Sequence, residues 1–280
     1  MARPEEAERS DRSTSDEHLA RVAAYHDACA EDYDAHYEQH FPLYHRVTWS
    51  NIRRYLPDEP DSLILDAGGG TGTFAVKLAQ MGYRLVLTDV SDGMLAQARR
   101  KVADFGLEDR ISIVPADVCA MPELEDGQFA LALCEGDPLS YCEDAEAGAR
   151  ELARVVRPGG FVIASVDNRP ATLKQLTEEQ GQQAVEGLLA EGRMFVPHEQ
   201  EELSFVGHSF TAHELRNLFE RVGLTVERLI GKLVIAPRLS CYRSENPAIQ
   251  DWLLDLELTY SEDPAYIPLA GHLEIVGRRP

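Results

Sequence analysis

The chain has 280 residues and a formal net charge of −21, and 44% of its residues are apolar. This length and composition predict one large domain, or a core with a small insertion, that buries a substantial apolar interior. The basic residues form no cluster longer than Arg99–Lys101, so the chain lacks the basic face with which proteins hold a polyanion, and nucleic acid is disfavoured as a partner.

Sequence patterns also exclude other classes. No run of 18 apolar residues occurs, so we expect no membrane helix, and the charged stretch Met1–Glu17 does not have the pattern of a signal peptide. We therefore expect a cytoplasmic protein. The five cysteines show no paired CxxC spacing and predict buried thiols rather than disulfides or zinc ligands. The acidic composition is typical either of an Arg-favouring genome or of a high-salt source.

The beginning of the chain predicts a tail followed by a helical lid. Residues 1–16 are polar and charged, a composition typical of disorder. Apolar residues from Asp16 to His40 recur at a spacing of three to four, which predicts helix, and we assign residues 17–56 to an N-terminal helical lid. His36 and His40 stand four residues apart, a spacing that can hold a metal on one helical face. Because no third ligand with clear spacing follows, we predict no metal site.

The most informative segment joins a strand, a glycine loop and a helix. The apolar run 63–67 leads into four glycines between 68 and 72, and the helical pattern 73–81 follows. Glycines let a ligand touch the main chain, and the amides that open the next helix face that ligand. The loop departs from a dinucleotide fingerprint, because Thr73 replaces the third glycine and Asp66 would repel a pyrophosphate. Asp66 instead suits a ligand that carries an amino group.

An acidic residue ends the next strand. The apolar run 83–88 leads to Asp89, 23 residues after Asp66, where a carboxylate can accept hydrogen bonds from both hydroxyls of a ribose. Asp89 could instead cap the helix that follows. Ser91 or Asp92 could supply that cap equally well, which would free Asp89 for a ligand.

Two more strands continue the pattern. The β-branched run 111–115 leads to Asp117, which is either a ligand contact or a turn residue. The apolar run 129–134 is followed by the loop 135–141, which we expect to lie across the ligand. A helical pattern, a Pro-Gly-Gly turn and the strand 161–166 come next.

The C-terminal part predicts an insertion and the remaining strands. Residues 168–210 are more than a simple crossover needs, and long insertions usually carry function. Thr211 and Glu214 have the spacing of a capping box. The predicted elements are a helix over 172–189, short strands over 193–197 and 203–207, a helix over 211–222, a strand over 224–235, a helix over 246–258 and a strand over 273–276.

The stretch Asp66-x-Gly68-x-Gly70-x-Gly72 resembles motif I of the class I S-adenosylmethionine-dependent methyltransferases of the small-molecule type. With the later strand ends and the Pro-Gly-Gly turn, the resemblance covers residues 62–167. It implies an α/β fold with a Rossmann-like, doubly wound sheet of seven strands in the order 3-2-1-4-5-7-6, the seventh antiparallel. The implied parts are a cofactor-binding core over 57–167, a substrate-covering insertion over 168–210 and the C-terminal part of the core over 211–280.

The resemblance implies S-adenosyl-L-methionine as the cofactor. Asp66 is assigned to its amino group, Asp89 to the ribose and Asp117 to the adenine. A tyrosine of the lid reaches the methionine part in such enzymes, although here the lid tyrosines could also merely pack on the core. The expected cofactor contacts are Tyr33, Tyr37, Asp66, Ala67, Gly68, Gly70, Gly72, Asp89, Val90, Asp117, Val118 and Glu135.

The implied activity is methyl transfer by in-line displacement to an oxygen, nitrogen or carbon of a small molecule. An oxygen acceptor needs a general base, and the candidates are His198, His208, Tyr141 and Asp137. Both histidines could instead be structural or surface residues. Whether the protein is a monomer or a homodimer stays open.

Three alternatives remain. A tRNA or rRNA methyltransferase would often carry Asn/Asp-Pro-Pro-Tyr after the fourth strand, where this chain has Glu135-Gly136-Asp137-Pro138. A non-catalytic S-adenosylmethionine or S-adenosylhomocysteine binder would share the cofactor contacts and transfer no methyl group. An NAD-dependent oxidoreductase is disfavoured by Thr73 and by the charge of Asp66.

Overall fold

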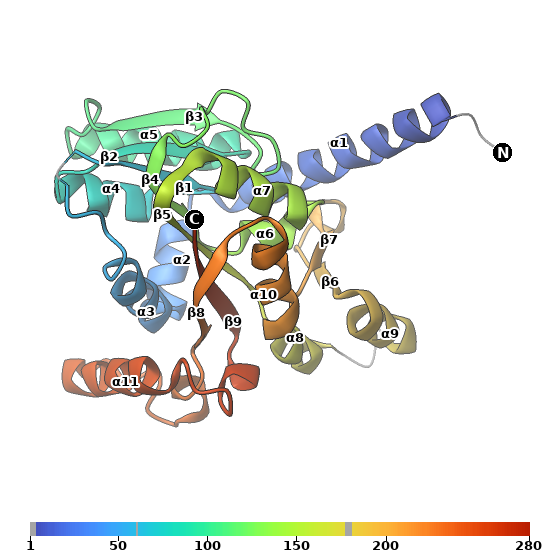
Figure 1. Ribbon diagram of the computed structural model, residues 1–280. Helices are drawn as coiled ribbons and strands as arrows, with labels where there is room; N and C mark the ends of the chain where they lie inside the picture. The colour runs from blue at the N-terminus through green and yellow to red at the C-terminus, as the bar shows by residue number, and fades with distance from the viewer. Residues whose placement is uncertain (1–3, 60, 177–180) are drawn as a thin grey trace.

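The computed structural model describes the backbone of residues 4–59, 61–176 and 181–280, and the side chains of these residues except 4–15, 37–40, 42 and 175. Among the described residues, seven strands form one twisted sheet in the order β3-β2-β1-β4-β5-β9-β8 (Figure 1). Its strands are β1 (Leu63–Ala67), β2 (Arg84–Asp89), β3 (Ile111–Pro115), β4 (Phe129–Cys134), β5 (Val156–Asp167), β8 (Thr225–Lys232) and β9 (His272–Arg278). The predicted sheet order is confirmed.

Strands β1 to β5 run parallel, and β9 pairs antiparallel with both β5 and β8. The carboxyl ends of β1 to β4 therefore meet at one edge of the sheet, which is where ligands bind in such folds. The last of the seven sheet strands along the chain is β9, and it is the antiparallel strand that the prediction calls the seventh.

Helices cover both faces of the sheet because neighbouring strand residues point to opposite sides. Ile64 packs with α4 (Thr73–Gln80) and α5 (Asp92–Asp104) on one face. Its neighbour Leu65 belongs to the cluster of the other face, formed with α7 (Ala145–Val155) and α10 (Ala212–Arg221). The strands are thus buried on both sides, as their apolar runs predict.

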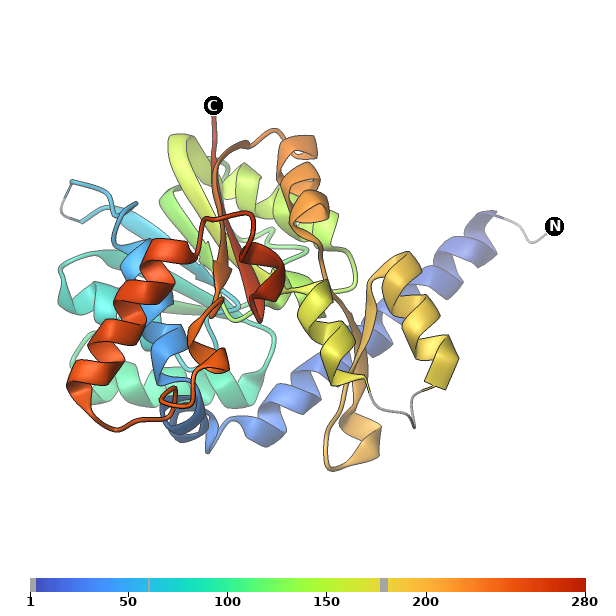
Figure 2. The same ribbon diagram turned by 90° about the horizontal axis from the view of Figure 1, so that it is seen from below.

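The predicted helix starts have the expected caps. The Ser91 side chain accepts a hydrogen bond from the Met94 amide at the start of α5, so Asp89 is not needed as the cap. Thr211 and Glu214 form the capping box of α10. A further helix, α11 (Pro247–Tyr260), packs beside α3 (Pro42–Ile52), as Figure 2 shows.

The N-terminal helices lie over the ligand edge. Helix α1 (Pro4–Cys29) begins inside residues 1–16, for which the composition predicts disorder, and α2 (Tyr33–His40) follows it. Proline at the first helical position and the Glu-, Ala- and Arg-rich sequence behind it favour this helix. None of the described helices is both long and apolar enough to span a bilayer.

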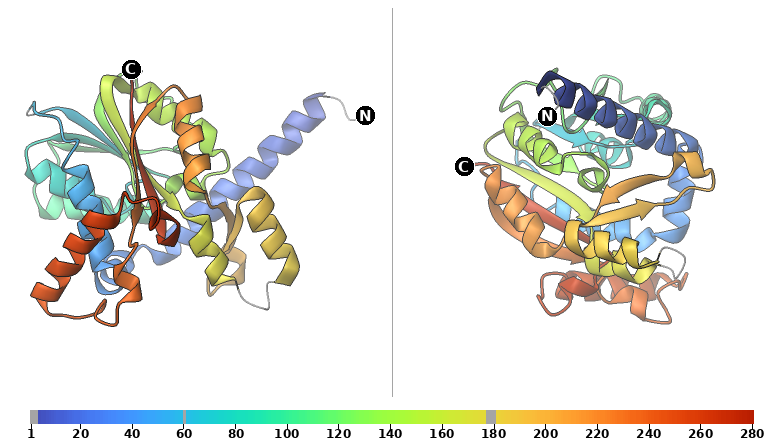
Figure 3. Two further views of the ribbon diagram at one scale, coloured as in Figure 1. Left: turned by 60° about the horizontal axis from the view of Figure 1, so that its bottom comes forward. Right: turned by 90° about the vertical axis from the view of Figure 1, so that its right-hand side faces the viewer.

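The insertion forms two helices where one long helix is predicted, and its two predicted strands pair as a hairpin. Helices α8 (Arg169–Gln175) and α9 (Gly181–Glu191) replace the predicted helix over 172–189, because Leu176 is extended and ends α8. Strands β6 (Arg193–Val196) and β7 (Phe205–His208) pair antiparallel. The hairpin lies beside α1, which contacts β7 and the 3-10 helix η2 (Glu201–Leu203), as Figure 3 shows. The remaining short helices are α6 (Pro138–Tyr141), η3 (Ala236–Arg238) and η4 (Ile267–Leu269).

Candidate functional site

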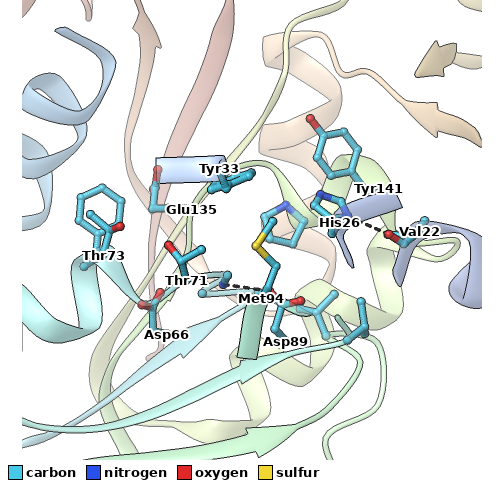
Figure 4. A pocket seen from close by; sticks show the side chains of 18 of the residues that line it. Val22, His26, Tyr33, Asp66, Thr71, Thr73, Asp89, Met94, Glu135 and Tyr141 are labelled. Carbon is cyan, nitrogen blue, oxygen red and sulfur yellow. Dashed lines mark hydrogen bonds between the residues drawn. The ribbon is translucent and has the colours of Figure 1, made fainter. Parts of the chain in front are cut away.

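A cavity lies at the carboxyl edge of the parallel strands, beneath the N-terminal helices (Figure 4). Its space amounts to about 1070 Å³ when the solvent at its open mouth is included. Its floor is the glycine loop and the residues after β2, β3 and β4, and its roof comes from α1, α2 and α3. A recess at this edge of a parallel sheet is where nucleotide-type ligands bind in such folds.

The glycine loop exposes its main chain to this cavity. Gly68 and Gly70 have φ angles of +64° and +54°, which side-chain-bearing residues rarely adopt. A Cβ at Gly68 would overlap the ring of Pro138, whereas a Cβ at Gly70 would meet only the Met94 Sδ, at 3.9 Å. Gly70 therefore faces open space where a ligand can approach the backbone.

Asp66 provides a buried carboxylate without a full set of partners. The residue is 2% exposed, and its Oδ2 has no hydrogen-bond partner among the described residues. Burial raises the pKa of Asp66, the hydrogen bond from the Ala75 amide opposes this shift, and the nearby charges of Glu135 and Asp89 add to it, which together give a pKa of about 7. A buried acceptor of this kind is normally satisfied by a donor, and a ligand ammonium group would supply one.

Asp89 is fixed by the main chain at the end of β2. Its Oδ1 accepts a hydrogen bond from the Ser91 amide and its Oδ2 one from the Gly70 amide, both at 2.9 Å. Each carboxylate oxygen can accept more than one hydrogen bond, so this rigid group can still bind a diol from the cavity. Asp117 also lines the cavity while its Oδ1 accepts from the Cys119 amide at 3.0 Å, so it serves as a turn residue as well.

Two aspartates attach the N-terminal helices to this floor. Asp27 of α1 accepts hydrogen bonds from the Ser91 hydroxyl at 2.6 Å and from the Gly93 amide at 2.7 Å. Asp34 of α2 accepts from the Thr71 hydroxyl at 2.6 Å and pairs with Lys101 at 2.5 Å. The roof is therefore joined to the same loops that form the ligand floor.

Comparison with known proteins agrees with this geometry. A family model described as "Methyltransferase domain" matches residues 64–160, which run from β1 to the start of β5. Residues 64–160 are therefore a methyltransferase domain of the class I S-adenosylmethionine-dependent type. S-adenosyl-L-methionine is the methyl donor of this domain.

The relatives of this methyltransferase domain include small-molecule enzymes. The chain is 37% identical over 100 residues to a demethylmenaquinone methyltransferase of Clavibacter sepedonicus, covering 36% of this chain and 39% of that protein. It is 30% identical over 134 residues to the ubiquinone/menaquinone biosynthesis C-methyltransferase UbiE of Pectobacterium carotovorum subsp. carotovorum (strain PC1), covering 47% of this chain and 50% of that protein. The match thus spans half or less of the length of each of these relatives.

A solved structure shares the fold of most of the chain. The crystal structure of an S-adenosylmethionine-dependent methyltransferase from Mesorhizobium loti superposes with a TM-score of 0.56, at 21% identity, and covers 83% of this chain and 98% of that one. This likeness supports the fold of the methyltransferase domain and its flanking helices.

Most of the predicted cofactor contacts lie on the cavity wall. The lining residues include Tyr33, Asp66, Gly68, Gly70, Asp89, Val90, Asp117, Val118 and Glu135. Ala67 is fully buried in the strand core instead, and Gly72 faces inward, where its Cβ would lie 3.1 Å from Leu87 Cδ1. The side chain of Tyr37 lies outside the described residues.

The four residues predicted as candidates for the general base do not lie together. Of these four, only Tyr141 lines the cavity. His208 packs its ring against Phe210, with centroids 4.5 Å apart, because the β6–β7 hairpin directs it away from the cavity. His198 packs its ring against Tyr25 of α1. Neither histidine is placed to touch a ligand in this cavity.

Asp137, the fourth candidate, is buried behind the wall. It adopts φ +68°, and its carboxylate lies 2.8 Å from His272 Nδ1. The carboxylate of Asp167 lies 3.7 Å from the same nitrogen. Burial lowers the pKa of His272, but the charges of Asp137 and Asp167 outweigh this effect and raise that pKa. Candidate ligand atoms of these three residues lie within 4.8 Å of one another.

Sequence reasoning missed a buried charge network behind the cavity. Lys232 of β8 is 0% exposed, and its ammonium lies 2.7 Å from Glu135 Oε2, 3.5 Å from Glu274 Oε2 and 2.8 Å from the Tyr44 hydroxyl. Burial holds the pKa of Glu274 well above its usual range, so Lys232 pairs chiefly with Glu135, which lines the cavity. A lone lysine inside the apolar run 229–235 is the signal that could have indicated it.

Proposed function

We propose that this protein transfers a methyl group from S-adenosylmethionine to a small-molecule acceptor. The observation that carries the proposal is the buried Asp66, whose Oδ2 has no hydrogen-bond partner among the described residues, on the same cavity wall as the glycine loop and Asp89 in a methyltransferase domain. Asp66 and Glu135 would hold the donor's ammonium group, Asp89 its ribose, and Asp117 with Val118 its adenine. Tyr33 would close the methionine side from the lid.

The electrostatics of the cavity restrict the acceptor. No lysine or arginine is among the described residues that line it, whereas five carboxylates are: Asp34, Asp66, Asp89, Asp117 and Glu135. Asp34 and Glu135 are paired with Lys101 and Lys232, which leaves Asp66, Asp89 and Asp117 as the acidic groups that disfavour a phosphate- or carboxylate-bearing acceptor. Aromatic and apolar side chains complete the wall, which favours an uncharged acceptor with an aromatic or isoprenoid body.

The donor supplies an already activated methyl group, so the chain contributes mainly alignment. Holding two reactants in line can contribute about 7–11 kcal/mol, and no conspicuous catalytic motif is then needed. The relatives named above are quinone-type C-methyltransferases, which makes demethylmenaquinol a first acceptor to assay. Nucleic acid stays disfavoured by the acidic composition and by the carboxylate-lined cavity.

Isothermal titration with S-adenosylhomocysteine, and with NAD in parallel, tests this proposal. We expect binding of S-adenosylhomocysteine alone, and at least tenfold weaker binding by Asp89→Ala, because the substitution removes a charge-assisted ribose contact worth about 1.4 kcal/mol or more. Asp104→Ala, at the distal end of α5, is the matched control and should bind like the wild type.

Four results would contradict the proposal or a part of it. Binding of NAD instead would return the site to the dinucleotide class, and unchanged affinity in a folded Asp89→Ala protein would remove the ribose assignment. Tight RNA binding in a low-salt mobility-shift assay would favour the tRNA or rRNA alternative. Donor binding without transfer to any acceptor would identify a non-catalytic binder.

A further inference from the structure

Three side chains that can bind a metal ion converge behind the cavity wall, each from a different part of the fold. Asp137 immediately precedes α6, in the loop after β4, while Asp167 ends β5 and His272 begins β9. Asp167 and His272 are direct partners in the antiparallel pairing of β5 with β9, so their side chains leave the sheet on the same face. The sheet therefore holds two of the three groups together, and the loop after β4 brings the third.

The separations between these groups are close to those of ligands on a single ion. His272 Nδ1 lies 2.8 Å from Asp137 Oδ2 and 3.7 Å from Asp167 Oδ1. One candidate ligand atom of each residue lies within 4.8 Å of the other two. Nitrogen and oxygen ligands bind zinc at about 2.0–2.2 Å, which places neighbouring ligands about 3–3.5 Å apart. Small side-chain movements would thus bring all three groups onto one ion.

The two carboxylates of this cluster carry buried oxygens that no donor satisfies. Asp137 is 3% exposed, and its Oδ1 has no hydrogen-bond partner among the described residues, nor has Oδ2 of Asp167. The Asp137 carboxylate points at the imidazole, because its other oxygen makes the 2.8 Å contact with His272 Nδ1. Buried acceptors are normally satisfied by a donor or a cation, so these oxygens indicate a ligand position.

Negative charge exceeds positive charge around these residues. The nearby buried Lys232 pairs with Glu135 at 2.7 Å. In the described part of the chain, no lysine or arginine forms an ion pair with Asp137 or Asp167. Burial and the charge of Asp137 raise the pKa of Asp167 to about 7, although His272 opposes this shift. A protonated His272 would balance one carboxylate at most, whereas a divalent cation would balance both.

We propose that Asp137, Asp167 and His272 bind one divalent transition-metal ion, such as Zn²⁺ or Mn²⁺, that joins the loop after β4 to the β5–β9 pair. One imidazole nitrogen and two carboxylate oxygens suit these ions better than Mg²⁺, which prefers oxygen ligands alone. The side chains of Asp167 and His272 are 20% and 26% exposed, so water can complete the coordination. This inference does not depend on the methyl-transfer function proposed above.

The ion would lie behind the cavity rather than in it. None of its three ligands is among the described residues that line the cavity, whereas Gly136 and Pro138, on either side of Asp137, are. Tyr44, another lining residue, packs against His272 with ring centroids 5.0 Å apart. The ion therefore has a structural role. It fixes the loop in which Asp137 holds φ +68°, and it touches neither donor nor acceptor.

Calorimetric titration of the full-length protein with MnCl₂, after dialysis against EDTA and then against metal-free buffer, tests the site. We expect a single Mn²⁺ to bind, and Mg²⁺ to bind at least about tenfold more weakly. Pulsed electron paramagnetic resonance of the Mn²⁺ complex should show coupling to an imidazole nitrogen. His272→Gln should abolish this coupling, whereas His213→Asn, which changes an exposed histidine of α10, should keep it.

Asp137→Asn tests the carboxylate with little change in shape. Asparagine tolerates the positive φ of this position, so the variant should fold. We expect its Mn²⁺ affinity to fall at least about 100-fold, because a charged ligand becomes neutral. Mn²⁺ at about 100 times its Kd should raise the Tm of the wild type by about 4 °C, and that of Asp137→Asn by less than about 1 °C. Asp109→Asn, which changes an exposed acid before β3, is the matched control and should respond like the wild type.

Three outcomes would overturn the site. Failure of both Mn²⁺ and Zn²⁺ to bind the folded wild type would show that a proton on His272 balances the cluster instead. Mn²⁺ binding that survives in both Asp137→Asn and His272→Gln would place the ion elsewhere on the acidic surface. Tighter binding of Mg²⁺ than of Mn²⁺ would remove the imidazole from the ligand set. If Asp137→Asn is unfolded by circular dichroism, Asp167→Asn takes its place.

Discussion

Asp66 shows how burial prepares a single residue for a ligand. Its ordinary pKa is 3.8, and burial in the folded protein raises that pKa to about 7. Between these two values the unfolded chain releases the proton while the folded chain keeps it, so the contribution of Asp66 to stability falls as the pH rises from about 4 to about 7. A cationic group placed beside it reverses this cost.

This arrangement predicts pH-dependent donor binding. A ligand ammonium group binds the ionised form of Asp66, so S-adenosylhomocysteine affinity should rise about tenfold from pH 6 to pH 8, with proton uptake by the buffer on binding below pH 7. Calorimetry in buffers of different ionisation enthalpy measures both effects. Asp66→Asn should bind more weakly and lose the pH dependence, and a wild-type profile in that variant would sink the assignment.

The residues that could be predicted from the sequence are those that end a strand. Asp66, Asp89 and Asp117 follow apolar runs, and parallel strands bring their carboxyl ends to one edge. His198 and His208 were candidates for the general base, but neither lines the cavity. The short hairpin that carries them decides where their side chains lie, and the sequence does not show this.

Helix α1 depends on a few polar contacts with the core. A Cβ at Gly93 would lie 3.1 Å from the Asp27 Cα and 3.2 Å from the Ala30 Cβ, so the close approach of α1 to α5 requires glycine there. Asp27 then satisfies the Gly93 amide and the Ser91 hydroxyl. The helix is held at its C-terminal end, where His26 lies.

Removing Asp27 should therefore loosen the lid. We expect Asp27→Ala to cost about 1 kcal/mol, as the loss of a helix cap does, and to weaken donor binding several-fold. Hydrogen exchange should show faster exchange of the α1 amides while the strands stay protected. Asp32→Ala changes an exposed acid between α1 and α2 and should have no such effect. Equal exchange in both variants would show that α1 is held by apolar contacts alone.

At the level of elements, the sequence predicted the core better than the insertion. Strand periods and capping residues located β1, β2 and α10, because these signals are local. The helix over 172–189 was predicted as continuous, and the extended conformation at Leu176 divides it. Such a break depends on packing against the rest of the chain, which a periodic pattern does not contain.

In the whole molecule, Lys232 connects distant parts of the chain. Its partners Tyr44, Glu135 and Glu274 come from α3, the end of β4 and β9. Glu135 is 97 residues away in sequence, which is why no local pattern revealed the pair. Its charge is compensated inside the fold rather than by water.

Removing this charge should destabilise the entire fold. Lys232→Met keeps the length and apolar character of the side chain but leaves Glu135 without its cation. We expect the free energy of unfolding to fall by about 3–5 kcal/mol, as when one partner of a buried ion pair is removed. Urea titration measures this, with the exposed Lys174→Met on α8 as the control. A loss below 1 kcal/mol would mean that Glu135 is readily protonated or hydrated.

Ser91 lies at the junction of the lid and the donor floor. Its amide supports Asp89 at the ribose position, and its hydroxyl binds Asp27 of α1. Movement of α1 and the rigidity of the ribose carboxylate are therefore coupled through one residue, and such coupling acts equally in both directions. Whatever favours the docked lid tightens the hold on the donor, and a bound donor favours the docked lid by the same factor.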